Sequence, residues 1–189
     1  MNKNSKNRIC NVAIVGPYLA GKTTLLESLL AVTGAISRKG SIKEGNTIGD
    51  STAEARLRQM SVEISTGTTI VEDVQFTFID CPGSIEFSQD TYNALIGVDA
   101  AIIVCEPTID RVLTLSPLFK FLDDWEIPHL VFVNKIDKSN INFIDLLHAL
   151  KQVSSRPLVA HQYPIVEGER LLGFIDLVTE QAYHPDFSR

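Results

Sequence analysis

Short hydrophobic runs alternate with amphipathic segments along most of the chain. Four runs predict buried strands, at residues 8–15, 74–80, 100–106 and 127–134. Four segments have apolar residues at helical spacing and predict helices, at residues 22–33, 88–96, 109–124 and 141–153. Pro117 lies inside the third segment and is expected to kink or divide it. Strands separated by helices predict a doubly wound, mostly parallel α/β sheet with helices on both faces.

Two regions depart from this alternation. Residues 35–60 are polar and contain several glycines, which predicts a long surface loop with a short helix near residues 53–59. After Pro157 the chain has two short apolar runs, 158–165 and 171–178, joined by V-E-G-E-R, which predict a two-stranded excursion.

Composition narrows the class of protein. With 189 residues and 44% hydrophobic content, the chain can bury one substantial core. The net charge is −6 and the basic residues are scattered, so we expect no direct DNA binding and no basic patch for RNA. We find neither a cleavable signal core nor an apolar stretch long enough to span a membrane, and therefore expect a cytoplasmic location.

The segment G-P-Y-L-A-G-K-T (16–23) fits the phosphate-binding pattern G-x-x-x-x-G-K-[ST] between a predicted strand and a predicted helix. Backbone N–H groups of such a loop surround phosphate oxygens, Lys22 reaches the β- and γ-phosphates, and the Thr23 hydroxyl can bind Mg²⁺. The alternative is a chance Gly-Lys-Thr turn. We expect nucleotide contacts along the whole loop, from Gly16, Pro17, Tyr18, Leu19, Ala20, Gly21, Lys22, Thr23 and Thr24.

Asp80 ends a predicted strand and begins D-C-P-G, a D-x-x-G pattern. Downstream of a phosphate loop, such a carboxylate holds Mg²⁺, usually through water, and the Gly83 N–H senses the γ-phosphate. Alone the pattern is weak, because Asp before Pro-Gly is also ordinary turn chemistry. Nucleotide contacts are expected from the segment Asp80, Cys81, Pro82, Gly83 and Ser84.

A third motif, N-K-I-D (134–137), follows the last buried strand, at the edge where open parallel sheets bind ligands. The Asp137 carboxylate can accept hydrogen bonds from guanine N1–H and its 2-amino group, whereas adenine offers no matching pair of donors. Asn134 is expected to hold the loop and the base edge, with the Lys135 stem along the ring plane. Taken in isolation, the N-K-I-D motif could also be the solvated start of a helix. For the function, the alternative is an ATP-using P-loop enzyme, which Asn134 and Asp137 argue against.

These motifs, in this order, resemble those of the translational GTPases, and in particular the G domain of elongation factor G and its elongation-factor-G-like relatives. The likeness covers nearly the whole chain and includes R-Q-M-S-V (58–62), which stands where the family has its R-G-I-T-I switch. It implies a P-loop G domain that binds GTP or GDP with Mg²⁺ and hydrolyses GTP, within a longer protein that works on the ribosome. Residues 1–155 are expected to form the G domain, without its last strand and helix, and residues 156–189 the start of an inserted subdomain.

By residue matching, Ser61 takes the position of the family's switch threonine, which serves Mg²⁺ and the γ-phosphate. Thr23, Ser61 and Asp80 are then the expected metal ligands. An ordinary loop serine is an equal alternative for Ser61, since Thr52, Thr66 and Thr68 are nearby.

The sequence departs from the family's pattern at several positions. The expected catalytic groups are Lys22, Gly83 and Ser84. Ser84 stands where the family has the histidine that positions the attacking water, and a serine is a poor substitute for it. Slow or partner-dependent hydrolysis is therefore expected. A turn residue without a catalytic share is the alternative, and the protein would then be a GTP-responsive binding module. Leu19 replaces an aspartate. The chain ends before the family's S-A-[LK] loop, which predicts weakened nucleotide affinity and an exposed sheet edge beside strand 129–134.

Overall fold

The computed structural model describes residues 8–49, 61, 63–138, 142–167 and 170–184. The chain divides into two compact units, one of residues 1–105 and 124–132 and one of residues 106–123 and 133–189. The short helix expected at residues 53–59 lies outside the described residues. The domain boundary expected after residue 155 stays a prediction.

A five-stranded sheet organises the first unit. Its strands are β1 (Arg8–Val15), β2 (Ser65–Val71), β3 (Val74–Asp80), β4 (Ala100–Cys105) and β5 (His129–Val133), in the order β2-β3-β1-β4-β5. The central strand β1 pairs in parallel with β3 and β4, and β2 pairs antiparallel with β3. The predicted mostly parallel α/β sheet is confirmed, and β2 is an addition that the pattern of apolar runs did not predict.

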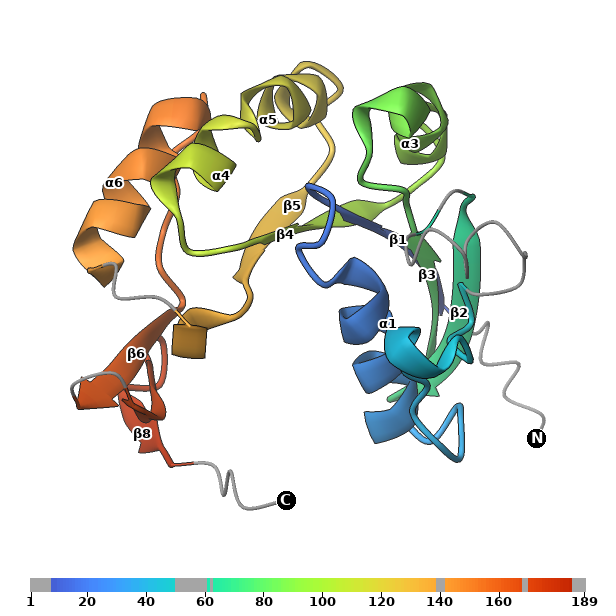
Figure 1. Ribbon diagram of the computed structural model, residues 1–189, viewed down its shortest axis with the longest axis horizontal. Coiled ribbons are helices and arrows are strands. Elements are labelled where there is room, and N and C mark those ends of the chain that lie inside the picture. Colours follow the sequence, from blue (N-terminus) through green and yellow to red (C-terminus); the bar gives the residue numbers. More distant parts are fainter. Residues whose placement is uncertain (1–7, 50–60, 62, 139–141, 168–169, 185–189) are drawn as a thin grey trace, which may run out of the picture. The chain divides into compact units, whose positions relative to one another are not determined.

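Two helices of this unit, α1 (Lys22–Val32) and α3 (Ser88–Leu95), lie on opposite faces of the sheet (Figure 1). Alternation along β1 sends Val12 and Ile14 toward α1, where they form one cluster with Leu26, Leu30, Phe78 and Val104. Leu26 and Leu30 are fully buried, which stabilises the fold by roughly 1.5–3 kcal/mol for each side chain. This packing fixes the start of α1 against the end of β1.

The second unit contains α4 (Ile109–Leu113), α5 (Ser116–Asp124) and α6 (Phe143–Val153). The helix expected at residues 109–124 is divided in two, and Pro117 lies in the first turn of α5, where its missing N–H has no helical partner to lose. Asn142 caps α6 by accepting a hydrogen bond from the Ile144 N–H at 2.7 Å.

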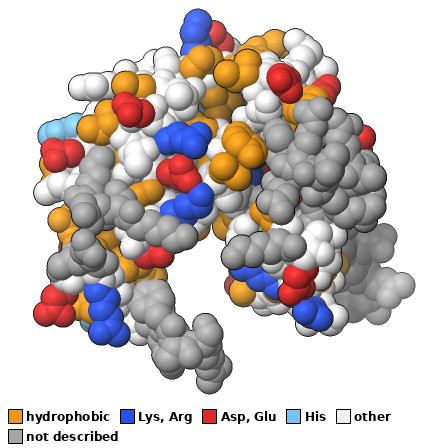
Figure 2. Space-filling view, viewed as in Figure 1, with side chains coloured by type: hydrophobic (Ala, Val, Ile, Leu, Met, Phe, Trp, Pro, Cys, Tyr) orange, Lys and Arg blue, Asp and Glu red, His pale blue; other side chains and the backbone are white. Residues whose placement is uncertain are grey.

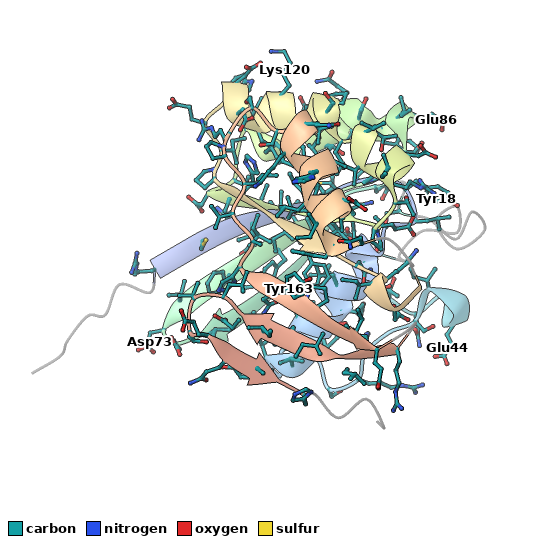
Figure 3. The ribbon with its side chains drawn as sticks, turned by 90° about the vertical axis from the view of Figure 1, so that its left-hand side faces the viewer. Tyr18, Glu44, Asp73, Glu86, Lys120 and Tyr163 are labelled. Carbon is teal, nitrogen blue, oxygen red and sulfur yellow. The ribbon has the colours of Figure 1, made fainter. Side chains whose placement is uncertain are left out.

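A three-stranded antiparallel sheet follows in the same unit, formed by β6 (Gln162–Glu167), β7 (Arg170–Asp176) and β8 (Gln181–Tyr183). The two expected strands correspond to β6 and β7, which pair with each other. The third strand was not predicted, because the three-residue β8 is too short and too exposed to show an apolar pattern. Tyr163 of β6 packs edge-on against Phe143 of α6, with ring centroids 4.9 Å apart, and Figure 3 shows it where the sheet meets the helix.

On the face seen in Figure 2, the Lys and Arg side chains of the described residues are interspersed with Asp and Glu. No helix within the described ranges combines the length and apolar character needed to cross a membrane. Strand β5 forms one edge of the large sheet, as expected for residues 129–134, and two of its apolar side chains, Leu130 and Phe132, are 54% and 40% exposed.

Candidate nucleotide-binding site

The predicted phosphate loop connects the carboxyl end of β1 to the start of α1, as the motif requires. Gly16 has φ +139°, and a Cβ there would lie 2.1 Å from the Val104 carbonyl oxygen, so only glycine fits beside β4. Gly21 has φ +98° in the left-handed region and stands directly before Lys22. The two glycines therefore shape the turn that lets the helix begin at the sheet edge.

Lys22 lies inside this loop with only 6% of its surface exposed. Its Nζ donates hydrogen bonds to the carbonyl oxygens of Gly16 and Pro17, both at 3.0 Å. Burial lowers the pKa of Lys22, and the nearby Asp80 and Cys81 act in the opposite direction. The ammonium is thus held at the loop, where a phosphate group would meet it.

Asp80 ends β3 beside this loop and is completely buried. The Thr23 hydroxyl donates to Asp80 Oδ2 at 2.6 Å, and the Ser61 hydroxyl lies 3.1 Å from Thr23 Oγ1. Among the described residues, Asp80 Oδ1 has no hydrogen-bond partner. Burial raises the pKa of Asp80 to about 6, although the Thr23 hydroxyl, the Lys22 charge and the Ser61 hydroxyl act to lower it.

The three predicted metal ligands, Thr23, Ser61 and Asp80, therefore lie close together. A carboxylate oxygen without a partner and two hydroxyls are oxygen ligands of the kind that Mg²⁺ prefers. Within the described part of the chain no group of three His, Cys, Asp or Glu side chains could hold a metal ion. Of the competitors for the role of Ser61, Thr66 and Thr68 are exposed on β2, and Thr52 lies outside the described residues.

The D-C-P-G turn after Asp80 packs onto the phosphate loop. The Cys81 N–H donates to the Ile14 carbonyl at 3.1 Å, and burial raises the pKa of its thiol to about 12, so the thiol stays neutral. A Cβ at Gly83 would lie 2.3 Å from Lys22 Nζ and 2.7 Å from the Tyr18 nitrogen. Gly83 therefore brings its backbone within reach of the phosphate loop.

Ser84 is half-buried and stands directly before the 3-10 helix η2 (Ile85–Phe87). Its backbone is extended, with φ −80° and ψ 143°, and its hydroxyl makes no hydrogen bond that caps this helix. Its carbonyl accepts from the Phe87 N–H at 3.1 Å. The serine is placed one residue beyond Gly83, where the resemblance expects a water-positioning group.

The N-K-I-D segment belongs to the second unit and runs from the end of β5 into the 3-10 helix η3 (Ile136–Lys138). Lys135 has φ +58°, and its ammonium pairs with Glu106, the residue that follows β4. Glu106 also pairs with Arg111 Nε at 3.4 Å. Asn134 is half-buried and Asp137 is exposed.

Sequence reasoning assigned no role to Glu106, which pairs with Lys135 and Arg111. The available signal was its position, because Asp80 ends one strand of the same sheet and Asn134 directly follows another. The first unit contains the phosphate loop, Ser61 and Asp80, and the second unit contains Asn134, Lys135 and Asp137. The convergence of the three motif loops on one nucleotide therefore stays a prediction.

Comparisons with known proteins agree with these motifs. The family model of the elongation factor Tu GTP binding domain matches residues 7–180. The chain is 61% identical over 183 residues to an "Elongation factor G-like protein" of Synechocystis, covering 97% of this chain and 27% of that protein. It is 31% identical over 180 residues to elongation factor G of Gluconobacter oxydans, covering 95% of this chain and 26% of that protein.

A solved structure from Thermus thermophilus superposes on 97% of this chain and 27% of its own chain, with a TM-score of 0.85 at 29% identity. The chain thus spans about a quarter of the length of these relatives. The family match covers both units and all three nucleotide motifs. The chain therefore belongs to the translational GTPases, as a GTP-binding G domain of the elongation factor G-like type.

Proposed function

We propose that this chain binds GTP and GDP together with Mg²⁺ and hydrolyses GTP to GDP, as the nucleotide-binding part of a cytoplasmic elongation-factor-G-like protein that works on the ribosome. The observation that carries the proposal is the contact of Thr23 and Ser61 beside the partnerless oxygen of buried Asp80. Such a cluster is costly in a protein that binds no cation there, because the carboxylate loses its hydration without full compensation.

Each residue of the first unit has a distinct task in this proposal. Lys22 and the backbone N–H groups of the phosphate loop hold the β- and γ-phosphates, and the Gly83 N–H contacts the γ-phosphate. Thr23, Ser61 and Asp80 hold the metal, directly or through water. When bound there, Mg²⁺ neutralises charge on the phosphate oxygens.

The chemical step is the attack of water on the γ-phosphorus, which breaks its bond to the bridging oxygen and releases GDP and phosphate. Ser84 can orient this water through its hydroxyl but cannot place a positive imidazolium beside the developing charge. We therefore expect slow hydrolysis by this chain, with faster hydrolysis when a partner such as the ribosome supplies the missing stabilisation.

Guanine selection rests on Asn134, Lys135 and Asp137. Titration of the chain with GDP and with ATP, each with and without Mg²⁺, tests it together with the metal site. We expect binding of GDP that Mg²⁺ strengthens, and far weaker binding of ATP. Asp137→Asn should remove the preference for GDP, whereas Asp145→Asn, an exposed residue of α6, should leave it unchanged. Preference for ATP would refute the proposal.

A second candidate is a GTP-responsive binding module that exchanges nucleotide with little or no hydrolysis. The observation in its favour is Ser84, which provides no titratable group at the position of the family's histidine. Phosphate release in single-turnover reactions, with and without ribosomes, separates the two candidates. Release that ribosomes accelerate supports the GTPase, and stable GTP under both conditions supports the binding module.

A further inference from the structure

A second buried carboxylate lies on the same helix face as the metal ligand Thr23. Glu27 follows Thr23 by four residues, one helical turn, and its side chain is almost completely buried, with 2% of the residue exposed. Burial of a carboxylate is unfavourable unless hydrogen bonds replace its lost water. The phosphate and metal chemistry described above gives Glu27 no task.

Both carboxylate oxygens of Glu27 accept hydrogen bonds from the backbone of one loop. Oε2 accepts from the Gly40 N–H and Oε1 from the Ile48 N–H, each at 2.7 Å. Hydrogen bonds to an ionised acceptor are among the stronger ones in proteins. We call residues 40–48 the tethered loop, because Glu27 fixes both of its ends to α1.

The tethered loop is also closed by its own contacts. The Ser41 N–H donates to Asn46 Oδ1 at 2.7 Å, and the Asn46 side chain donates to Glu44 at 3.0 Å. Gly40 approaches so closely that a Cβ there would lie 2.7 Å from the Asn46 carbonyl oxygen. The 3-10 helix η1 (Ile42–Glu44) lies beside α1 in Figure 1, and Figure 3 shows Glu44 on the outer side of the loop.

The exit of the loop lies against the metal ligands. Ile48 packs on the core cluster of the first unit, and a Cβ on Gly49 would lie 3.5 Å from Thr23 Cγ2 and 3.8 Å from Ser61 Oγ. Glu27 thus holds Ile48, and the next residue, Gly49, lies in the space beside Thr23 and Ser61.

We propose that Glu27 is a positioning residue for the magnesium site, holding the tethered loop on α1 so that the loop exit at Gly49 stays beside the contact between Thr23 and Ser61. The proposal rests on the proposed function, because it assigns Glu27 to the Mg²⁺ affinity of the nucleotide complex. Glu27 itself does not contact the nucleotide or the metal.

The test follows the release of a fluorescent GDP analogue from the 189-residue chain while free Mg²⁺ is varied. Glu27→Gln places an amide NH₂ against one of the two backbone donors, so one buried N–H loses its acceptor. We expect the Mg²⁺ concentration that half-maximally slows release to rise about tenfold. Affinity for the analogue in excess chelator should change by less than about twofold, since phosphate and base contacts are unaffected.

Glu72→Gln is the matched control, because Glu72 is exposed in the turn between β2 and β3. It should leave both measurements at their wild-type values. Amide hydrogen exchange at Gly40 and Ile48 reports on the tether itself and should accelerate in Glu27→Gln only. A purely structural role would instead weaken binding equally with and without Mg²⁺.

An unchanged Mg²⁺ midpoint in Glu27→Gln, with normal wild-type binding, would overturn the role of Glu27 but leave the proposed function standing. Wild-type binding of GDP without any Mg²⁺ dependence would overturn both. Should Glu27→Gln not fold, Asn46→Ala loosens the same loop from its exposed side. A raised midpoint in that variant supports the proposal, and a wild-type midpoint contradicts it.

Discussion

Replacing Asp80 by Asn should stabilise the chain at neutral pH in the absence of nucleotide and Mg²⁺. Burial raises the pKa of Asp80 from 3.8 to about 6, so the folded state binds a proton more tightly than the unfolded state does. At about 1.4 kcal/mol for each pKa unit, the ionised carboxylate lowers the free energy of unfolding by about 3 kcal/mol above pH 6. Asn keeps an acceptor for the Thr23 hydroxyl, but its buried NH₂ group offsets about 1–2 kcal/mol of the gain.

The difference in free energy of unfolding between Asp80→Asn and wild type is expected to depend on pH. Between pH 6 and pH 4 the folded wild-type chain takes up a proton that the unfolded chain does not yet bind, so the cost of the charge disappears as pH falls. The stability difference between Asp80→Asn and wild type should therefore be largest above pH 6 and decline by about 3 kcal/mol toward pH 4. Urea unfolding of both proteins between pH 4 and pH 7.5 measures it. A difference that does not vary with pH would refute this account of Asp80.

Substitutions at three further positions test other parts of the site. Gly83→Ala places a Cβ 2.7 Å from the Tyr18 nitrogen, and we expect GDP affinity to fall at least about tenfold in a titration; wild-type affinity would contradict the contact. Ser84→His supplies the missing imidazole and should raise the single-turnover hydrolysis rate by about 100-fold. Ser84→Ala should leave the slow rate almost unchanged. Loss of activity in Ser84→Ala would show that the hydroxyl is catalytic. Glu106→Gln removes the charge that holds Lys135 and should weaken GDP binding about fivefold. The control substitution Asp110→Asn should leave GDP binding unchanged. Equal weakening by Glu106→Gln and Asp110→Asn would point to a general charge effect.

The strands and helices with continuous apolar patterns were predictable, because their burial is strong and local. Residues 8–15 form β1 without any change of boundary, and the helix predicted from residue 22 begins at Lys22. Strand β2 escaped prediction because Ser, Thr and Gly occupy most of its seven positions, and its place in the sheet depends on pairing with β3. β8 depends in the same way on its neighbour β7.

The candidate site shows the same division. The proximity of Lys22 and Asp80 could be predicted because each lies at a fixed position of a motif, and the role of Asp137 stays a prediction. The contact between Ser61 and Thr23 joins residues 38 positions apart, and the two bonds of Glu27 reach 13 and 21 positions along the chain. No periodic pattern reports such contacts, since they arise when a loop folds back on a helix.

The exposed side chains of Leu130 and Phe132 also affect how this chain behaves in solution. They belong to β5, an edge strand of the large sheet. An edge strand offers its backbone groups to any other extended chain, and apolar side chains make that addition favourable. Concentrated preparations of these 189 residues should therefore aggregate through β5, and a charged side chain in place of Leu130 is the substitution most suited to keeping them monomeric.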